Sequence, residues 1–186
     1  AGGYRSDEFW RSVSSSRRAD FLCQDRTPGP ANWASAATAS ELPDYPVAGI
    51  CYYEALAFVA WLERSVAAPD GMQWCLPSED MWEFAARGPE GLLYPWGAEF
   101  EEGRCNSREA NIGRPSKAGQ FPEGRSVFGA EDMAGNLWEF VRASDQRSWS
   151  CVLRGGSYVN SREEIKSSLR LFGVPRDHRP RDFGMR

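Results

Sequence analysis

The chain has 186 residues, of which 41% are hydrophobic and 13% aromatic, so it can bury the core of one domain. Its formal net charge of −4 gives no overall case for nucleic-acid binding, and no apolar run reaches the roughly 18 residues of a membrane span. Five cysteines without a C-x-x-C spacing argue against a disulfide framework and a zinc site, although one disulfide involving Cys23 is left open. With no visible signal peptide, the scattered thiols slightly favour a reducing cytoplasm.

The N-terminal residues 1–27 are expected to form an arm that packs on the core, and residues 28–186 to form the domain. Aromatic residues at Phe9, Trp10 and Phe21 can attach the arm to the core. Pro28-Gly29-Pro30 interrupts any helix at the boundary.

A first helix is predicted near residues 52–66. Ala55, Phe58, Val59, Leu62 and Val66 recur at the spacing of one helix face, so this face is expected to point to the core.

A second helix is predicted to begin after Ser78, which suits the N-cap position, and to end at Gly88. Trp82, Phe84 and Ala85 are its expected core contacts.

An oxygen-rich motif follows in a long irregular stretch. Asp132 and Glu139 lie seven residues apart, with Gly135 and Asn136 permitting a tight bend between them. Two convergent carboxylates with nearby carbonyls suit Ca²⁺, which takes oxygen ligands. The alternative is a turn in which both carboxylates cap backbone N–H groups.

The C-terminal region predicts two short strands, at residues 152–154 and 183–186, around a segment without steady period. A long irregular segment held between strands is typical of a binding surface. Its side chains mix apolar contact area with directional polar groups. The candidate contact residues are Tyr158, Asn160, Ser161, Leu169, Leu171, Phe172, Val174, Arg176, His178, Arg181 and Asp182. The alternative is that the Leu and Phe residues face the core.

Catalytic chemistry finds little support in the residues. His178 is the single histidine, so a three-histidine metal site cannot form, and a catalytic triad would depend on this one imidazole. Gly155-Gly156 lacks the Lys-Ser/Thr that a phosphate loop carries.

Several motifs in order resemble the formylglycine-generating-enzyme (sulfatase-modifying factor) domain. They are Leu76-Pro-Ser-Glu-Asp-Met-Trp-Glu-Phe-Ala-Ala-Arg-Gly88, Tyr94-Pro-Trp-Gly97, Asp132-Met-Ala-Gly-Asn-Leu-Trp-Glu139, Arg154-Gly-Gly-Ser157 and Phe183-Gly-Met-Arg186. The resemblance implies an α+β, C-type-lectin-like fold with two helices, small twisted antiparallel sheets and extensive ordered loops.

The same resemblance bears on cofactors. The enzyme works through a cysteine pair, and the matching positions here are Asn160 and Ile165, so no copper site is expected. Related sulfoxide synthases need a histidine cluster for iron, which this chain lacks. A structural Ca²⁺ is implied instead, bound by the side chains of Asp132 and Glu139 and the carbonyls of Gly135 and Leu137.

A non-catalytic branch fits this pattern better. Variable proteins of diversity-generating retroelements resemble this chain and vary side chains just before a C-terminal motif similar to Phe183-Gly-Met-Arg186. The sequence therefore predicts a ligand-binding protein that recognises a protein or other macromolecule, but not nucleic acid, through residues 158–182. The alternatives are a formylglycine-generating-like or sulfoxide-synthase-like oxidase, or a sensor or scaffold domain of a larger protein. The oligomeric state is not set by the sequence.

Overall fold

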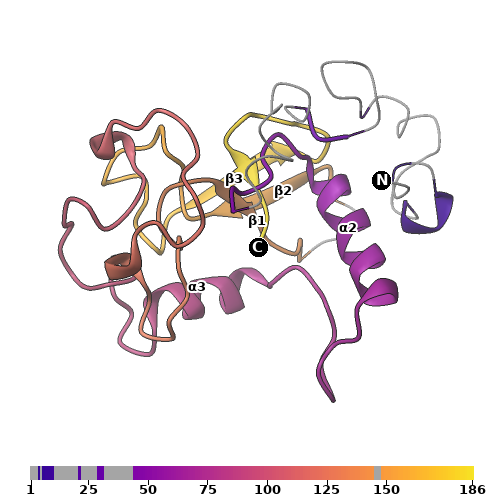
Figure 1. The fold of residues 1–186 in the computed structure, drawn as a ribbon, viewed down its shortest axis with the longest axis horizontal. Coiled ribbons are helices and arrows are strands. Elements are labelled where there is room, and N and C mark those ends of the chain that lie inside the picture. The colour runs from indigo at the N-terminus through magenta and orange to yellow at the C-terminus, as the bar shows by residue number, and fades with distance from the viewer. Residues whose placement is uncertain (1–3, 5, 11–20, 22–28, 32–43, 145–147) are drawn as a thin grey trace.

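The computed structural model describes residues 4, 6–10, 21, 29–31, 44–144 and 148–186 (Figure 1). Its α-helices are α2 (Tyr52–Ser65) and α3 (Glu79–Arg87). Short 3-10 helices cover Asp7–Phe9, Arg108–Ala110 and Pro122–Gly124. No helix in the described part of the chain is both long enough and apolar enough to cross a membrane.

Four short strands form one sheet in the order β3-β2-β1-β4. They are β1 (Trp138–Phe140), β2 (Ser150–Arg154), β3 (Arg170–Pro175) and β4 (Phe183–Gly184). β2 pairs antiparallel with β1 and β3, whereas β1 and β4 are parallel. The predicted strand at residues 152–154 is confirmed within β2, and the one at residues 183–186 is confirmed for its first two residues, which form β4. The predicted antiparallel pairing holds for β1 with β2 and for β2 with β3. β4 runs parallel to β1, because the chain after β1 returns through a long connection that brings β4 alongside it in the same direction.

Strand β3 was not expected from the sequence. Cys151 faces Val174 and Leu153 faces Leu171, so β3 carries one residue more than β2 between these pairs. Such a bulge breaks the two-residue alternation by which a strand is recognised. Gly173 lies in this interval with φ +74, a conformation that glycine adopts without strain.

The sheet lies between the two helices (Figure 1). Tyr52 and Ala55 of α2 pack against Phe140, Leu153 and Val174 on one face. Trp82 and Ala86 of α3 pack with Val141 and Val152 on the other face. Two helices with a small mixed sheet give the predicted α+β class.

Helix α3 begins and ends where the sequence predicts. The Ser78 hydroxyl accepts a hydrogen bond from the Met81 N–H at 3.1 Å, and Gly88 ends the helix with φ +66. Trp82 is buried as expected, but the prediction for Phe84 was wrong, since its side chain is 55% exposed. Two residues advance a helix by about 200°, so Trp82 and Phe84 cannot share one face.

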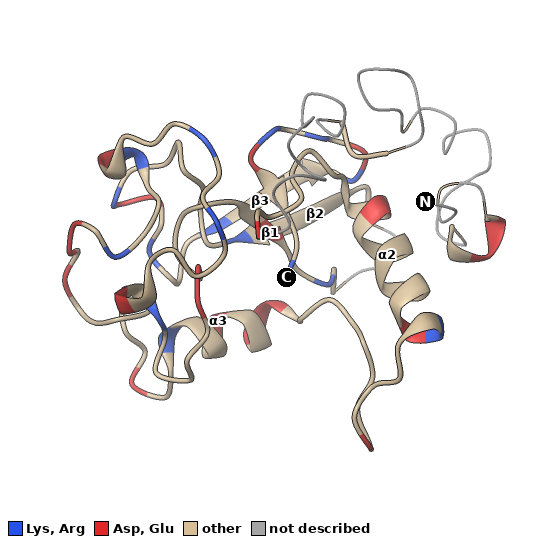
Figure 2. Cartoon of the chain, viewed as in Figure 1, with Lys and Arg blue, Asp and Glu red and all other residues tan. Residues whose placement is uncertain are grey.

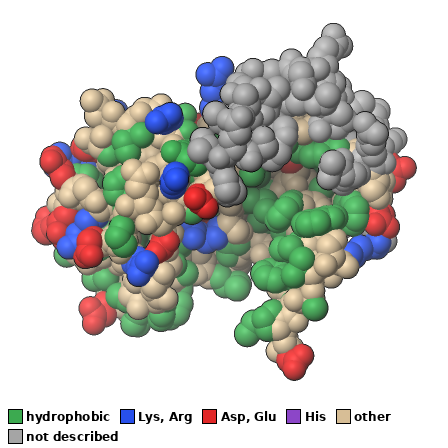
Figure 3. Space-filling model, in the orientation of Figure 1, with side chains coloured by type: hydrophobic (Ala, Val, Ile, Leu, Met, Phe, Trp, Pro, Cys, Tyr) green, Lys and Arg blue, Asp and Glu red, His purple; other side chains and the backbone are tan. Residues whose placement is uncertain are grey.

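The predicted face of α2 is confirmed only in part, at Ala55, which is buried, and at Val59, which packs against the core. The buried residues of the helix are Tyr52, Glu54, Ala55 and Ala57, whereas Phe58 and Val66 are exposed. Only the first turns meet the sheet, so later apolar residues lie beyond it. Hydrophobic side chains accordingly gather on the surface over α2 (Figure 3).

The described residues of the N-terminal arm form an aromatic cluster. Trp10 and Phe21 are buried against Cys51 and Ala57, and Tyr4 packs beside them. Most of residues 1–27 lie outside the described residues, so the boundary at residue 27 stays a prediction.

Candidate binding surface

The two ends of residues 158–182, called the display segment below, are joined to each other. The Ser157 hydroxyl donates to the Asp182 carboxylate at 2.8 Å, and the Asn160 side-chain oxygen accepts from the Ser157 N–H at 3.0 Å. The Asp182 carbonyl accepts from the Trp138 N–H of β1 at 2.8 Å. The residues that follow β2 and those that precede β4 therefore lie next to each other.

The first half of the display segment is fastened from below. Ile165 is fully buried with Tyr94, Cys105 and Ala134. The Ser167 N–H donates to the Leu93 carbonyl at 2.8 Å, and the Tyr94 hydroxyl donates to the backbone of the segment at 3.1 Å. A buried apolar residue and backbone hydrogen bonds fix this irregular chain without regular secondary structure.

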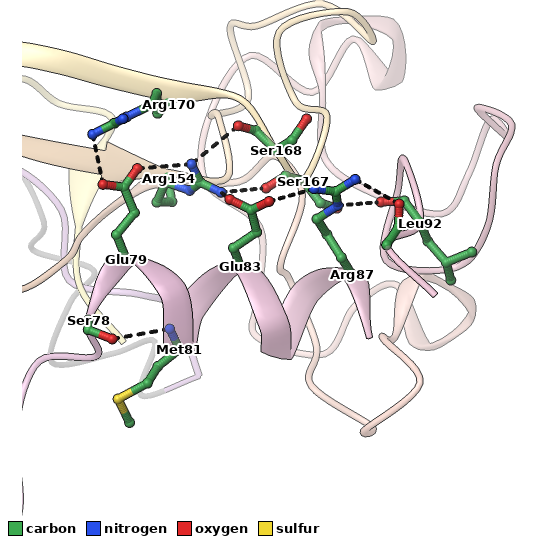
Figure 4. A network of polar contacts seen from close by, with 11 residues as sticks. Ser78, Glu79, Met81, Glu83, Arg87, Leu92, Arg154, Ser167, Ser168 and Arg170 are labelled. Carbon is green, nitrogen blue, oxygen red and sulfur yellow. Dashed lines mark hydrogen bonds and ion pairs between the residues drawn. The ribbon is translucent and has the colours of Figure 1, made fainter. Parts of the chain in front are cut away.

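Arg154 ties the same half to α3 (Figure 4). Its side chain is 1% exposed and lies over the Trp82 ring, 5.4 Å from the centroid. The guanidinium donates to Glu79 at 3.1 Å and to Glu83, and to the carbonyls of Ser167 at 2.9 Å and Ser168 at 3.2 Å. One planar cation thus holds a helix and a loop together.

The charges of α3 complete this network. Acidic residues occupy the first turn and Arg87 the last, as the helix dipole favours (Figure 2). Burial opposes ionisation of Glu83, but hydrogen bonds from Arg87 and Arg154 outweigh it and lower the pKa of this carboxyl. Glu79 also accepts from Arg170 of β3 at 2.8 Å. Glu83 therefore stays charged beside Arg154, and Glu79 binds the start of β3 through Arg170.

The second half of the display segment is fastened to α2 and the arm. The Arg176 carbonyl accepts from the Tyr52 N–H at 3.1 Å, and the Arg176 guanidinium lies 5.2 Å from the Tyr52 ring centroid. Arg179 donates to the buried Glu54 at 2.8 Å, and Glu54 also accepts from the Tyr4 hydroxyl at 2.5 Å. Both arginines point inward.

The predicted contact residues divide by exposure. Phe172, His178 and Arg181 are exposed, and Phe172 presents 72% of its surface. Leu169 and Leu171 are half-buried and pack against the core cluster. Tyr158 is also half-buried.

Two predicted contact residues need correction. Val174 is 8% exposed and Arg176 is 7% exposed, so neither can belong to an accessible surface. Val174 points to the core because it faces Cys151 across the ladder, and Arg176 because its guanidinium covers Tyr52. The bulge in β3 hid this orientation from sequence patterning.

The remaining polar candidates are half-buried and hold turns. Asn160 and Asp182 bind Ser157, and the Ser161 hydroxyl donates to the Glu164 carboxylate at 2.8 Å. Sequence reasoning also missed two exposed apolar side chains, Val159 at 50% and Trp149 at 70%. Trp149 precedes β2. A tryptophan within a polar stretch was the signal in the sequence that could have indicated an exposed contact residue.

Most cysteines in the described part of the chain are buried. Cys51, Cys105 and Cys151 are buried, and Cys75 is exposed; all four are free, while Cys23 lies outside the described residues. Burial raises the pKa of Cys151 to about 12 and that of Cys105 to about 12. Neither thiol is an available thiolate at neutral pH.

Three of the four residues predicted to bind calcium line one hollow of about 170 Å³. Asp132, Leu137 and Glu139 face it together with Arg186, whereas Gly135 does not. A Cβ atom added at Gly135 would lie 2.3 Å from the Asn106 carbonyl oxygen, so only glycine allows these two backbone segments to lie so close together. The hollow is called the carboxylate hollow below.

Both carboxylates of the carboxylate hollow already accept hydrogen bonds from other parts of the chain. The Arg186 guanidinium binds both oxygens of Glu139, and Asp132 accepts from the Gly119 N–H at 2.9 Å. In the part of the chain that the structure describes, no group of three or more His, Cys, Asp or Glu side chains is placed to hold a metal. Because Arg186 binds both oxygens of Glu139, this carboxylate is not open to calcium in this structure, and calcium binding by Asp132, Gly135 and Leu137 stays a prediction.

Comparisons with known proteins agree on one family and differ on activity. A sequence model described as Sulfatase-modifying factor enzyme 1-like domain matches residues 3–186. Inactive C-alpha-formylglycine-generating enzyme 2 of Bos taurus is 32% identical over 133 residues, which cover 63% of this chain and 40% of that protein. Hercynine oxygenase of Mycolicibacterium thermoresistibile is 27% identical over 212 residues, with 94% of this chain and 43% of that protein covered. The chain thus spans less than half the length of either relative.

A solved structure has the same fold. Treponema denticola variable protein 1 matches with a TM-score of 0.62 at 18% identity, over 76% of this chain and 70% of that chain.

Proposed function

The chain belongs to the sulfatase-modifying factor enzyme 1-like family, and from this premise we propose that it is a non-catalytic, ligand-binding member whose display segment contacts a protein or another macromolecule. Its fold is the C-type-lectin-like variant of that family. The observation that carries the proposal is that some side chains of the display segment point inward and bind the domain, whereas others are exposed and differ in chemical kind.

The alternation along the second half of the segment makes this concrete. Val174, Arg176 and Arg179 point inward and bind the body of the domain, whereas Phe172, before them, and His178, between the two arginines, are exposed. Exposed aromatic and cationic side chains on a rigid frame supply contact area without a large ordering cost. The exposed positions can change without disturbing the inward ones.

The non-catalytic part of the proposal has two supports. The positions matched to the cysteine pair of the enzyme are Asn160, which holds a turn, and Ile165, which is fully buried. A relative in the same family is named as inactive. Neither position offers a thiolate.

Within this proposal, the chain is a variable protein of a diversity-generating retroelement. The supports are its likeness in fold to Treponema denticola variable protein 1 and the chemical mixture of its exposed display residues. The second candidate is an oxidase, which the hercynine oxygenase relative favours because the match covers 94% of this chain. The single histidine, His178, argues against an oxidase, because the resemblance to sulfoxide synthases implies a histidine cluster that binds iron.

Sequencing the 3′ end of this gene from many isolates tests the proposal. We expect substitutions at the codons of Val159, Phe172, His178 and Arg181, no change at the codon of Ile165, and a near-copy of the 3′ end beside a reverse transcriptase gene. Changes spread evenly over buried and exposed codons would contradict a diversified surface. Oxygen-dependent turnover of a cysteine-containing peptide by the copper-loaded protein would contradict the non-catalytic reading.

A further inference from the structure

Arg186 makes a two-point contact with the buried Glu139 from the edge of the carboxylate hollow. Its Nε lies 3.0 Å from Glu139 Oε2 and its Nη2 lies 2.7 Å from Oε1. The Trp82 indole N–H donates to the same Oε2 at 2.7 Å. Both carboxylate oxygens of Glu139 therefore have donors, in the fork geometry that only arginine provides.

The second carboxylate of the carboxylate hollow lies in the field of the same guanidinium. Asp132 and Arg186 both line the hollow. The guanidinium therefore binds one of the two carboxylates that the family resemblance assigns to calcium and lines the same hollow as the other.

A calcium ion would compete with this arrangement. Ca²⁺ takes six to eight oxygen ligands at roughly 2.3–2.6 Å, and on Glu139 it would share a carboxylate with the guanidinium at a distance where two cations repel strongly. We propose that Arg186 occupies the cation position of the carboxylate hollow, so that a tethered guanidinium takes the place of the calcium that the family resemblance implies.

The consequence is a stability that does not depend on metal. Arg186 follows β4, Glu139 lies in β1 and Trp82 lies in α3, so this contact joins three elements distant in sequence. The inference does not depend on whether the display segment binds a ligand.

Thermal unfolding in excess EDTA and in excess CaCl₂ tests the wild-type protein. We expect the same Tm in both. A Tm that rises with Ca²⁺, and that no longer rises in Asp132→Asn, would overturn the proposal.

The variant Arg186→Met removes the charge and keeps the length of the side chain. In EDTA its Tm is expected to fall further than that of Arg170→Met, which removes an exposed arginine paired with Glu79. With the cation gone, Tb³⁺ luminescence is expected to report binding at least roughly tenfold tighter than in wild type, and Asp132→Asn is expected to abolish that gain. An unchanged Tm, or Tb³⁺ affinity equal to that of wild type, would show that the guanidinium does not fill a cation site.

Discussion

Replacing Arg154 by Met is the sharpest test of how the display segment is fastened. The side chain is 1% exposed and binds two carboxylates of α3 together with the carbonyls of Ser167 and Ser168. Methionine fills a similar volume but donates no hydrogen bond. The variant therefore removes the cation and leaves its acceptors in place.

The magnitude follows from the burial of each partner. Removing one partner of a buried ion pair costs about 3–5 kcal/mol. Glu79 and Glu83 are 26% and 31% exposed and keep Arg170 and Arg87 as partners, so the lower end applies. We expect a loss of about 3 kcal/mol in the free energy of unfolding, which corresponds to roughly 6–12 °C in Tm for a chain of this length.

Urea unfolding of Arg154→Met beside a matched surface variant measures this. Arg125→Met serves as control, because Arg125 is 53% exposed and pairs with Glu131. An exposed pair contributes at most about 1 kcal/mol. If the two variants differ by less than about 1 kcal/mol, Arg154 is not the fastening that its contacts indicate. Hydrogen exchange at residues 166–170 is expected to rise in Arg154→Met alone.

Three further outcomes follow from the same contacts. The pKa of Glu83 is lowered from its ordinary value of 4.5. Its contribution to the free energy of unfolding is therefore full above pH 4.5 and is lost as the pH falls through the pKa of the folded state. The difference in Tm between wild type and Glu83→Gln should accordingly close on acidification. Glu54→Gln removes the carboxylate that binds the buried Arg179 and should cost about 3 kcal/mol in urea unfolding, with faster hydrogen exchange at residues 176–182. Exchange equal to that of wild type would contradict this. Phe172→Ser should change the free energy of unfolding by less than about 0.5 kcal/mol, whereas Val174→Ser should cost about 2 kcal/mol, and equal losses would refute the assigned orientations.

Local signals in the sequence were reliable where the physics is local. Ser78 and Gly88 marked the ends of α3, because capping and left-handed backbone depend on neighbours in the chain. The alternation around Val152 and Phe183 marked β2 and β4. The ordered motifs determined the family, and with it the fold.

Which side chains of the display segment face outward was decided by tertiary structure. Val174 and Phe172 are both apolar and two residues apart, yet one is buried and the other exposed, because a bulge shifts the pairing with β2 between them. Arg176 and Arg179 resemble surface residues in sequence, but Tyr52 and Glu54 of α2 draw them inward.

The carboxylate hollow shows the same division. The spacing of Asp132 and Glu139 left open a shared oxygen site or a capped turn, and in the structure both side chains line one hollow. The sequence could not show that Arg186, 47 residues beyond Glu139, would return to the same point and bind it. Pairing of β1 with β4 brings that guanidinium to the hollow, and a contact across such a separation is set by strand topology rather than by local sequence.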